Sequence, residues 1–234
     1  LGPAASVRNP FLGCRSIRLC FQHIELFRAQ LRAILRASAF GRVQVLFPMI
    51  STLWEIRTAK RIIHETMAQL DEQGEAFRRD IEIDIMVEVP SAAWIADLLA
   101  REVDFFSLGT NDLVQYTLAV DRGNECVSDL FQPAHPAILR LIAHVIEVAR
   151  EHGTRVAMCG EMSGELVFAI LLTGLGLNEF SVSPAVIPRV KETIRSVSYS
   201  YAQEVAEKAL TFDDPAKTLE YLRRVLAEVL PEGE

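Results

Sequence analysis

The stretch IEIDIMVEVP, residues 81–90, alternates between aliphatic and other side chains until Pro90 ends the pattern. Alternation with a period of two predicts a β-strand. The odd positions are all aliphatic and suit a face covered by helices, whereas the even positions point to the opposite, inner face. The inner face places Glu88 at the carboxyl end of the strand and Asp84 near its middle, where a buried carboxylate needs a polar partner. We therefore expect a strand with one helix-covered face and an inner face that ends at Glu88.

Four more short apolar runs predict further strands. They span Val43–Ile50, Asp104–Gly109, Arg155–Glu161 and Glu179–Ser183. Stretches with helical spacing lie between and beside the strands, at Glu25–Ser38, Leu53–Gln73, Ser91–Glu102, Ala137–His152, Glu165–Leu175 and Pro215–Leu230. Strands that alternate with helices indicate βαβ units and a parallel sheet. The sequence thus predicts an α/β fold.

Composition restricts the class of protein. Half of the 234 residues are apolar and 24% are charged, which suits a soluble chain with a sizeable core. The net charge of −7 argues against non-specific nucleic-acid binding, which needs a basic surface. No apolar run approaches the roughly 18–20 residues of a membrane span, and no signal peptide is visible. Four cysteines without a CxxC pair indicate neither a disulfide framework nor a zinc site, so we expect a cytoplasmic protein with no membrane insertion.

Polar side chains gather where the predicted strands end, and these are Glu88, Asn111, Asp112, Cys159 and Glu161. The bodies of the same strands are largely apolar. In β/α barrels the active site is built at the carboxyl ends of several strands. The pattern therefore predicts one site on which these side chains converge.

Two pairs of charged residues are candidates for binding an anion and its metal ion. Glu88 and Asp112 end successive strands, and two hard oxygen ligands with room for substrate oxygens suit Mg²⁺. Either could instead be a helix N-cap or a surface acid. Arg15 and Arg122 lie in turn-rich segments, where guanidinium groups suit bidentate phosphate recognition. The alternative for both is an ordinary exposed arginine.

Cys159 is the remaining chemical candidate. A thiol at a strand end beside a cation or arginine can have a depressed pKa and act as an acid or nucleophile. The alternative is a small buried hydrophobic residue. The five histidines show no metal-ligand spacing, and we assign them no chemistry.

Several motifs closely resemble enzyme I of the bacterial sugar phosphotransferase system, the phosphoenolpyruvate–protein phosphotransferases. These motifs are NPFLGCRSIRL, LRAILRASAFG, LFPMI, MVEVPSAA, DFFSLGTNDLVQYTLAVDRGN, MCGE and GLNEFSVSPAVIPRVK, in chain order. The likeness runs from Asn9 to about Leu210. GTND and CGE alone also fit the related pyruvate phosphate dikinases and phosphoenolpyruvate synthases, whereas the continuation YTLAVDRGN is more typical of enzyme I.

The resemblance implies a role for each candidate residue. Glu88 and Asp112 match the Mg²⁺ ligands, and Cys159 matches the acid that protonates the methylene carbon as pyruvate forms. The residues that match substrate-binding positions, mainly those that hold the phosphate, are Arg15, Asn111, Asp112, Arg122 and Glu161. Phosphoryl transfer needs charge neutralisation and alignment above all, and this set supplies both.

The resemblance also implies an architecture and partners. The family's phosphoenolpyruvate-binding domain is an eight-stranded (β/α)₈ TIM-type barrel that forms a homodimer. The chain from 1 to 234 matches about strands 4–8 of that domain, without the first strands and without the N-terminal part that carries the phosphohistidine and docks a phosphocarrier protein. A five-stranded sheet cannot close, so we expect exposed edges at Val43–Ile50 and Glu179–Ser183.

Two departures leave alternatives open. Cys14 stands where the family has tryptophan or a similar residue, and this thiol could be redox-sensitive. A chain that lacks part of the barrel could also serve as a non-catalytic dimerisation or regulatory module. The other alternative is the corresponding domain of a dikinase or synthase. For the phosphotransferase, and for the dikinase or synthase, the expected ligands are phosphoenolpyruvate and pyruvate.

Overall fold

Five short strands form a single parallel sheet in the computed structural model, which describes residues 10–230. The strands lie side by side in chain order, as β1 (Gln44–Phe47), β2 (Glu82–Val87), β3 (Phe105–Gly109), β4 (Arg155–Cys159) and β5 (Glu179–Phe180). Within the described residues β1 and β5 pair only with β2 and β4, so the sheet is open. The two edges predicted from the sequence are confirmed.

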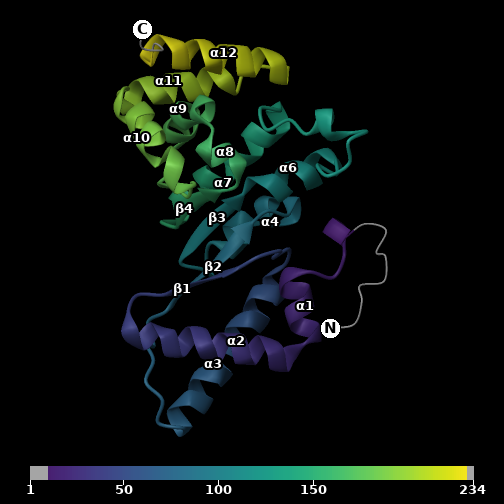
Figure 1. Ribbon diagram of the computed structural model, residues 1–234, viewed down its shortest axis with the longest axis vertical. Helices are drawn as coiled ribbons and strands as arrows, with labels where there is room; N and C mark the ends of the chain where they lie inside the picture. The colour runs from purple at the N-terminus through teal and green to yellow at the C-terminus, as the bar shows by residue number, and fades with distance from the viewer. Residues whose placement is uncertain (1–9, 231–234) are drawn as a thin grey trace.

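Helices join successive strands and cover one face of the sheet (Figure 1). The α-helices are α1 (Ser16–Gln22), α2 (Ile24–Ala37), α3 (Leu53–Glu72), α4 (Pro90–Trp94), α5 (Ala96–Leu99), α6 (Thr110–Leu118), α7 (Pro136–His152), α8 (Glu161–Gly164), α9 (Leu166–Leu175), α10 (Ile187–Arg195), α11 (Tyr199–Ala209) and α12 (Pro215–Val229). Short 3₁₀ turns are η1 (Pro10–Leu12), η2 (Ser38–Phe40), η3 (Ser128–Leu130) and η4 (Pro184–Val186). None of the helices in residues 10–230 is long and apolar enough to cross a membrane.

Local sequence signals explain where two of the longest helices begin or end. Thr52 and Glu55 form a reciprocal capping box at the start of α3, which satisfies backbone N–H groups that the helix leaves free. Gly153 ends α7 in the left-handed conformation that glycine adopts without strain.

The structure corrects several predicted elements. The single helix expected over Ser91–Glu102 breaks at Ile95 into α4 and α5. Helices α6, α10 and α11 were not predicted, and α6 begins with the polar run Thr110–Asp112, which resembles a loop in the sequence. The strand expected over Arg155–Glu161 stops at Cys159, because Gly160 has a φ of 103°.

The two faces of the sheet differ as the alternation of β2 predicted. The outer face, against the helices, is buried and apolar; it includes Ile83, Ile85, Val87, Phe106, Leu108, Val156 and Met158. The register pairs Met86 with Ser107 and Gly109 with Cys159, which places these residues on the inner face. The site residues that follow the strands therefore open onto the inner face at its carboxyl edge.

Asp84 lies fully buried on that inner face. Its Oδ1 accepts the backbone N–H of Phe105 at 3.0 Å, which supplies the partner that a buried carboxylate needs. Its Oδ2 has no hydrogen-bond partner among the described residues. Burial raises the pKa of Asp84 to about 8, and the neighbouring Asp104 and Glu82 charges add to the rise against the opposing Phe105 N–H.

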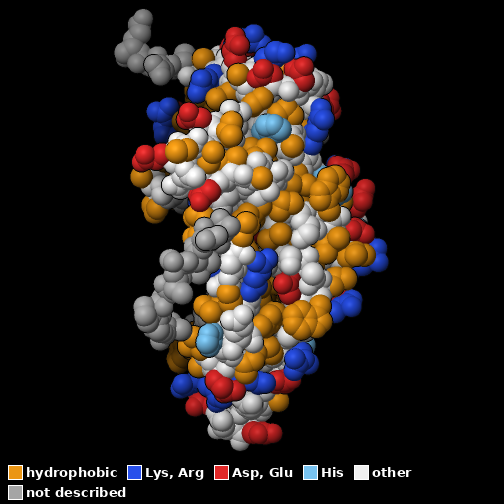
Figure 2. Space-filling model, turned by 90° about the vertical axis from the view of Figure 1, so that its right-hand side faces the viewer, with side chains coloured by type: hydrophobic (Ala, Val, Ile, Leu, Met, Phe, Trp, Pro, Cys, Tyr) orange, Lys and Arg blue, Asp and Glu red, His pale blue; other side chains and the backbone are white. Residues whose placement is uncertain are grey.

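Two groups of helices lie at opposite ends of the molecule, with α1–α3 at one end and α9–α12 at the other (Figure 1). Helices α9 and α11 approach so closely that a Cβ on Gly174 would lie 1.9 Å from the carbonyl oxygen of Ala202. Some large apolar side chains stay exposed, among them Trp54, Trp94 and Leu26. Figure 2 shows broad apolar areas across the middle of one face, with few charged side chains among them.

Candidate active site at the carboxyl ends of the strands

A pair of buried carboxyl groups forms the centre of the site. Glu88 directly follows β2, and Asp112 lies in the first turn of α6, after β3; their exposed fractions are 4% and 5%. The backbone N–H of Met49 donates to Oε1 of Glu88 at 2.6 Å. Burial raises the pKa of Glu88 to about 7; the Met49 N–H opposes this rise and the negative charge of the neighbouring Asp112 adds to it. The two acids thus share one site, as successive strand ends predicted.

Arg15 supplies positive charge to this pair. Its Nη2 lies 3.0 Å from Oδ2 of Asp112, and its Nη1 donates to the hydroxyl of Tyr116 at 3.4 Å. The Tyr116 hydroxyl donates in turn to the carbonyl oxygen of Phe11. The α1 segment is therefore tied to α6 through Arg15, which remains about one-third exposed (35%). Its remaining N–H groups can donate to an anion in the site.

Cys159 ends β4 beside the carboxyl pair. The hydroxyl of Ser107 donates to its Sγ at 3.3 Å, and Sγ lies 3.5 Å from the carbonyl oxygen of Leu108. Burial raises the pKa of Cys159; the Ser107 hydrogen bond opposes the rise and the charge of Glu88 adds to it. Of the two alternatives for Cys159, a thiol with a depressed pKa is therefore not found, because the group is buried next to an acid. A thiol that keeps its proton at neutral pH suits a proton donor, not a nucleophile.

The side chain of Asn111 contacts the backbone of Glu161. Oδ1 of Asn111 accepts the N–H of Glu161 at 3.0 Å, which fixes the loop after β4 on the start of α6. Gly160 permits this contact, since a Cβ there would lie 2.6 Å from Oγ1 of Thr110 and 3.0 Å from Oδ1 of Asn111. The Glu161 side chain is exposed, and both Asn111 and Glu161 line a cavity of about 200 Å³.

Arg122 stays apart from the carboxyl pair. It is half-buried on the loop after α6, where its backbone N–H donates to Oε1 of Gln115 at 3.1 Å. No carboxylate within residues 10–230 forms an ion pair with its guanidinium. The structure thus brings Arg15, Glu88, Asp112 and Cys159 together and leaves Arg122 without a described contact to them.

Three supporting residues were missed in the sequence. Met49 acts through its backbone, which has a φ of 61° and aims its N–H at Glu88. No pattern in the sequence marks such a residue. Tyr116 lies four residues after Asp112, and Ser107 lies two residues before Gly109. Helical and strand spacing respectively could have found these two.

The carboxyl pair fits a magnesium ion. Oδ1 of Asp112 is buried without a hydrogen-bond partner, so one ligand oxygen is already desolvated and free. No group of three or more His, Cys, Asp or Glu side chains in the described part of the chain could hold a metal. Two carboxylates are nonetheless sufficient for Mg²⁺, which keeps waters and takes substrate phosphate oxygens as its other ligands.

Residues 2–199 match the family model described as PEP-utilising enzyme, PEP-binding domain, where PEP is phosphoenolpyruvate. The chain belongs to this family. Curated relatives named phosphoenolpyruvate–protein phosphotransferase include those of Staphylococcus carnosus, 52% identical over 86% of this chain and 35% of the relative, and Bacillus subtilis, 50% identical over 92% and 38%. That of Buchnera aphidicola (Schizaphis graminum) is 49% identical over 93% and 38%. The chain therefore spans less than two-fifths of the length of these relatives.

The fold of this PEP-binding domain also resembles a solved structure. A citrate lyase from Burkholderia xenovorans matches 86% of this chain and 68% of its own with a TM-score of 0.54 and 19% identity. At that identity the likeness concerns the fold alone. The open parallel sheet with its outer helices is a partial β/α barrel of the TIM type.

Proposed function

We propose that this chain binds PEP for a phosphotransferase of the enzyme I type. That cytoplasmic enzyme moves the phosphoryl group of PEP to one of its own histidines, which releases pyruvate. It then passes the phosphoryl group to a phosphocarrier protein that serves sugar uptake. The observation that carries the proposal is the meeting of Glu88, Asp112, Arg15 and Cys159 at one edge of the sheet. About 50% identity to named phosphotransferases supports the same reaction.

The carboxyl pair and the arginines divide the binding of PEP between them. Glu88 and Asp112 would hold Mg²⁺, which neutralises charge on the phosphate and carboxylate oxygens of the substrate when bound. Arg15 would redirect some of its guanidinium N–H groups from Asp112 to the phosphate, since a guanidinium binds phosphate oxygens bidentately. Asn111 and Glu161 would line the same end of the site, and Arg122 would reach it from the loop after α6.

Cys159 would complete the chemistry after the phosphoryl group has left. Cleavage of the bond between phosphorus and the enol oxygen leaves the enolate of pyruvate. The electron pair of its carbon–carbon double bond takes the proton of the thiol, so a C–H bond forms as the S–H bond breaks. Pyruvate and a thiolate result, and the Ser107 hydroxyl donates to that thiolate. Exchange with water then restores the thiol.

Calorimetric titration of the chain with PEP tests the proposal. We expect measurable binding in the presence of Mg²⁺ and at least tenfold weaker binding without it. Glu88→Gln and Asp112→Asn each remove one metal ligand, so both variants are expected to lose the Mg²⁺-dependent part of binding. Glu72→Gln, an exposed acid at the end of α3, is the matched control and should bind like the wild type. Full affinity in Glu88→Gln or Asp112→Asn excludes that residue as a ligand.

We also propose that the chain forms a homodimer. Trp54 and Trp94 are 65% and 69% exposed, and aromatic residues are enriched in protein–protein interfaces relative to the rest of the surface. Sedimentation velocity over a range of concentrations tests this proposal. A sample that stays monomeric at the highest concentration contradicts it.

A further inference from the structure

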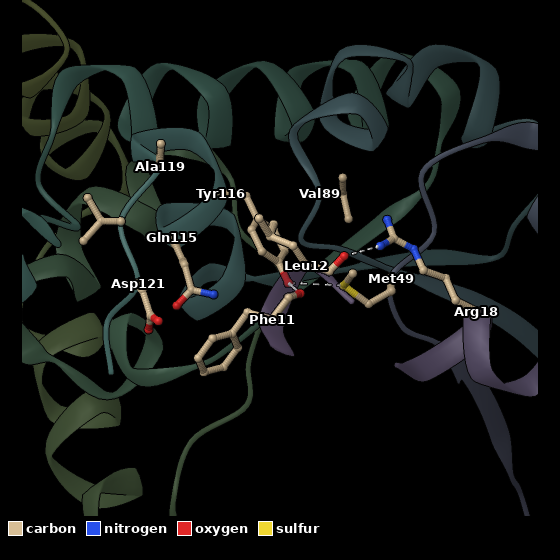
Figure 3. Close-up of a pocket in the computed structure, with 10 residues that line it drawn as sticks. Phe11, Leu12, Arg18, Met49, Val89, Gln115, Tyr116, Ala119 and Asp121 are labelled. Carbon is tan, nitrogen blue, oxygen red and sulfur yellow. Dashed lines mark hydrogen bonds between the residues drawn. The ribbon is translucent and has the colours of Figure 1, made fainter. Parts of the chain in front are cut away.

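A second cavity, of about 400 Å³, lies next to the candidate active site. It opens between η1 and α1 on one side and α6 on the other (Figure 3), and its walls are formed mainly by Phe11, Leu12, Met49, Val89, Tyr116 and Ala119. None of the candidate site residues lines it. Its volume lies within the range of about 300–1,000 Å³ that small-molecule sites occupy.

Two charged residues stand on opposite sides of this cavity. Figure 3 shows Arg18 at one side, with its guanidinium pointing from α1 toward Leu12 and Val89, and Asp121 at the other. Nη1 of Arg18 donates to the carbonyl oxygens of Leu12 and Gly13 at 3.3 and 3.4 Å. No carboxylate in residues 10–230 pairs with Arg18, although its side chain is half-buried. A half-buried guanidinium with only neutral partners favours an anion, which Asp121 would repel from the opposite side.

We propose that this cavity binds a small organic anion, a monocarboxylate with an aromatic or branched aliphatic body. The carboxylate lies at Arg18, where free N–H groups remain after the two carbonyl contacts. The body packs against Phe11, Met49 and Tyr116, which are apolar or aromatic and come from three separate segments. The single positive charge at Arg18, the mainly apolar walls and the negative charge of Asp121 on the far side disfavour a small, fully polar anion such as free phosphate as the preferred ligand.

Two wall residues connect this cavity to the carboxyl pair. The ring of Tyr116 lines the cavity while its hydroxyl contacts Arg15, and Met49 lines the cavity while its N–H holds Glu88. A ligand that shifts either residue changes the position of a group in the active site. Binding of the anion in this cavity does not depend on the proposed function, whereas its effect on PEP binding does. Couplings of this kind change affinities by about 5- to 150-fold, and equally in both directions.

Calorimetry with two matched probes, in the absence of Mg²⁺ and PEP, tests the binding. The probes are 3-phenylpropanoate and its neutral counterpart 3-phenylpropan-1-ol. We expect the carboxylate to bind at least tenfold more tightly than the alcohol. Arg18→Met keeps the apolar stem and should remove that preference. Arg32→Met, on α2 and likewise without a carboxylate partner, is the charge-matched control and should leave it unchanged.

Two further measurements place the probe. The ¹³C-methyl signal of Met49 should shift on titration with 3-phenylpropanoate, and Leu12→Ala should weaken both probes several-fold because it removes an exposed part of the wall. Equal affinities for the two probes, or an unchanged preference in Arg18→Met, overturn the proposal and indicate a purely apolar occupant. Strict competition between the probe and Mg²⁺–PEP overturns it as well, because the probe then occupies the active site. A loss of PEP binding alone contradicts the proposed function and leaves this cavity's ligand intact.

Discussion

Replacement of Cys159 by serine separates a proton donor from a residue that merely fills space. Serine keeps a hydrogen-bonding group between Ser107 and Leu108, so the fold around the strand end is expected to remain. The hydroxyl is a far weaker acid than the thiol, and general acid catalysis contributes about 10²- to 10⁴-fold in rate. In terms of the barrier this is about 3–5 kcal/mol. We therefore expect a rate loss of at least about 10²-fold with PEP affinity within about threefold, since the thiol faces the methylene carbon rather than the phosphate.

Exchange of the pyruvate methyl protons measures the same proton transfer in the reverse direction. Pyruvate dissolved in D₂O exchanges its methyl protons when a base removes one and an acid returns a deuteron, and NMR measures the rate. With Mg²⁺ present the wild-type chain is expected to accelerate this exchange above the protein-free rate, and Cys159→Ser to lose the acceleration. Calorimetry with PEP and a thermal unfolding curve on the same sample separate a chemical loss from a folding defect.

Cys20→Ser is the matched control for this experiment. Cys20 is also half-buried, and burial raises its pKa as well, but it lies on α1 away from the carboxyl pair. Its replacement should leave the exchange rate unchanged. An exchange rate in Cys159→Ser close to that of the wild type refutes the role of Cys159. The proton would then have to come from Glu161 or from water.

Three further predictions concern stability. Burial raises the pKa of Asp84 to about 8, so between about pH 4 and 8 this group keeps its proton longer in the folded state than in the unfolded one. Its contribution to the free energy of unfolding therefore falls as pH rises, by at most about 1.4 kcal/mol per pH unit. Denaturant titrations of Asp84→Asn should show a smaller fall than the wild type, and an identical slope contradicts the prediction. Gly174→Ala should lower the free energy of unfolding by at least about 2 kcal/mol, because the new Cβ meets the carbonyl oxygen of Ala202; a neutral result would mean that α9 and α11 are further apart. Ala119→Gly should raise it by about 1 kcal/mol, since Ala119 has a φ of 56° that strains any residue with a Cβ; a loss of stability would contradict that account.

The regular parts of the fold could be predicted from local patterns. The alternation in β2 identified its buried face and placed Glu88 at the strand end, and glycine after α7 marked the end of that helix. The helix expected over Ser91–Glu102 nevertheless breaks at Ile95, which has a non-helical ψ of 24° that composition does not reveal. Helix α6 was missed because its first residues are polar groups that serve the site rather than a regular amphipathic face.

The chemistry of the site depended on contacts that a sequence does not contain. Strand order alone brought Glu88 and Asp112 together, so that pair could be predicted. The state of Cys159 could not, because its pKa depends on burial and on the nearness of Glu88 and Ser107 from two other strands. The N–H that holds Glu88 comes from Met49, whose role rests on a backbone angle and not on its side chain.

We have proposed that Glu88 and Asp112 hold one metal ion, which would also contact the phosphate of PEP. Electron–nuclear double resonance with Mn²⁺ in place of Mg²⁺ measures this most directly, because a ³¹P coupling appears only when phosphorus lies close to the ion. We expect a protein-bound Mn²⁺ signal with a strong ³¹P coupling in the presence of PEP, and its loss in Asp112→Asn. Protein-bound Mn²⁺ without ³¹P coupling, or a coupling that persists in both Asp112→Asn and Glu88→Gln, would contradict it.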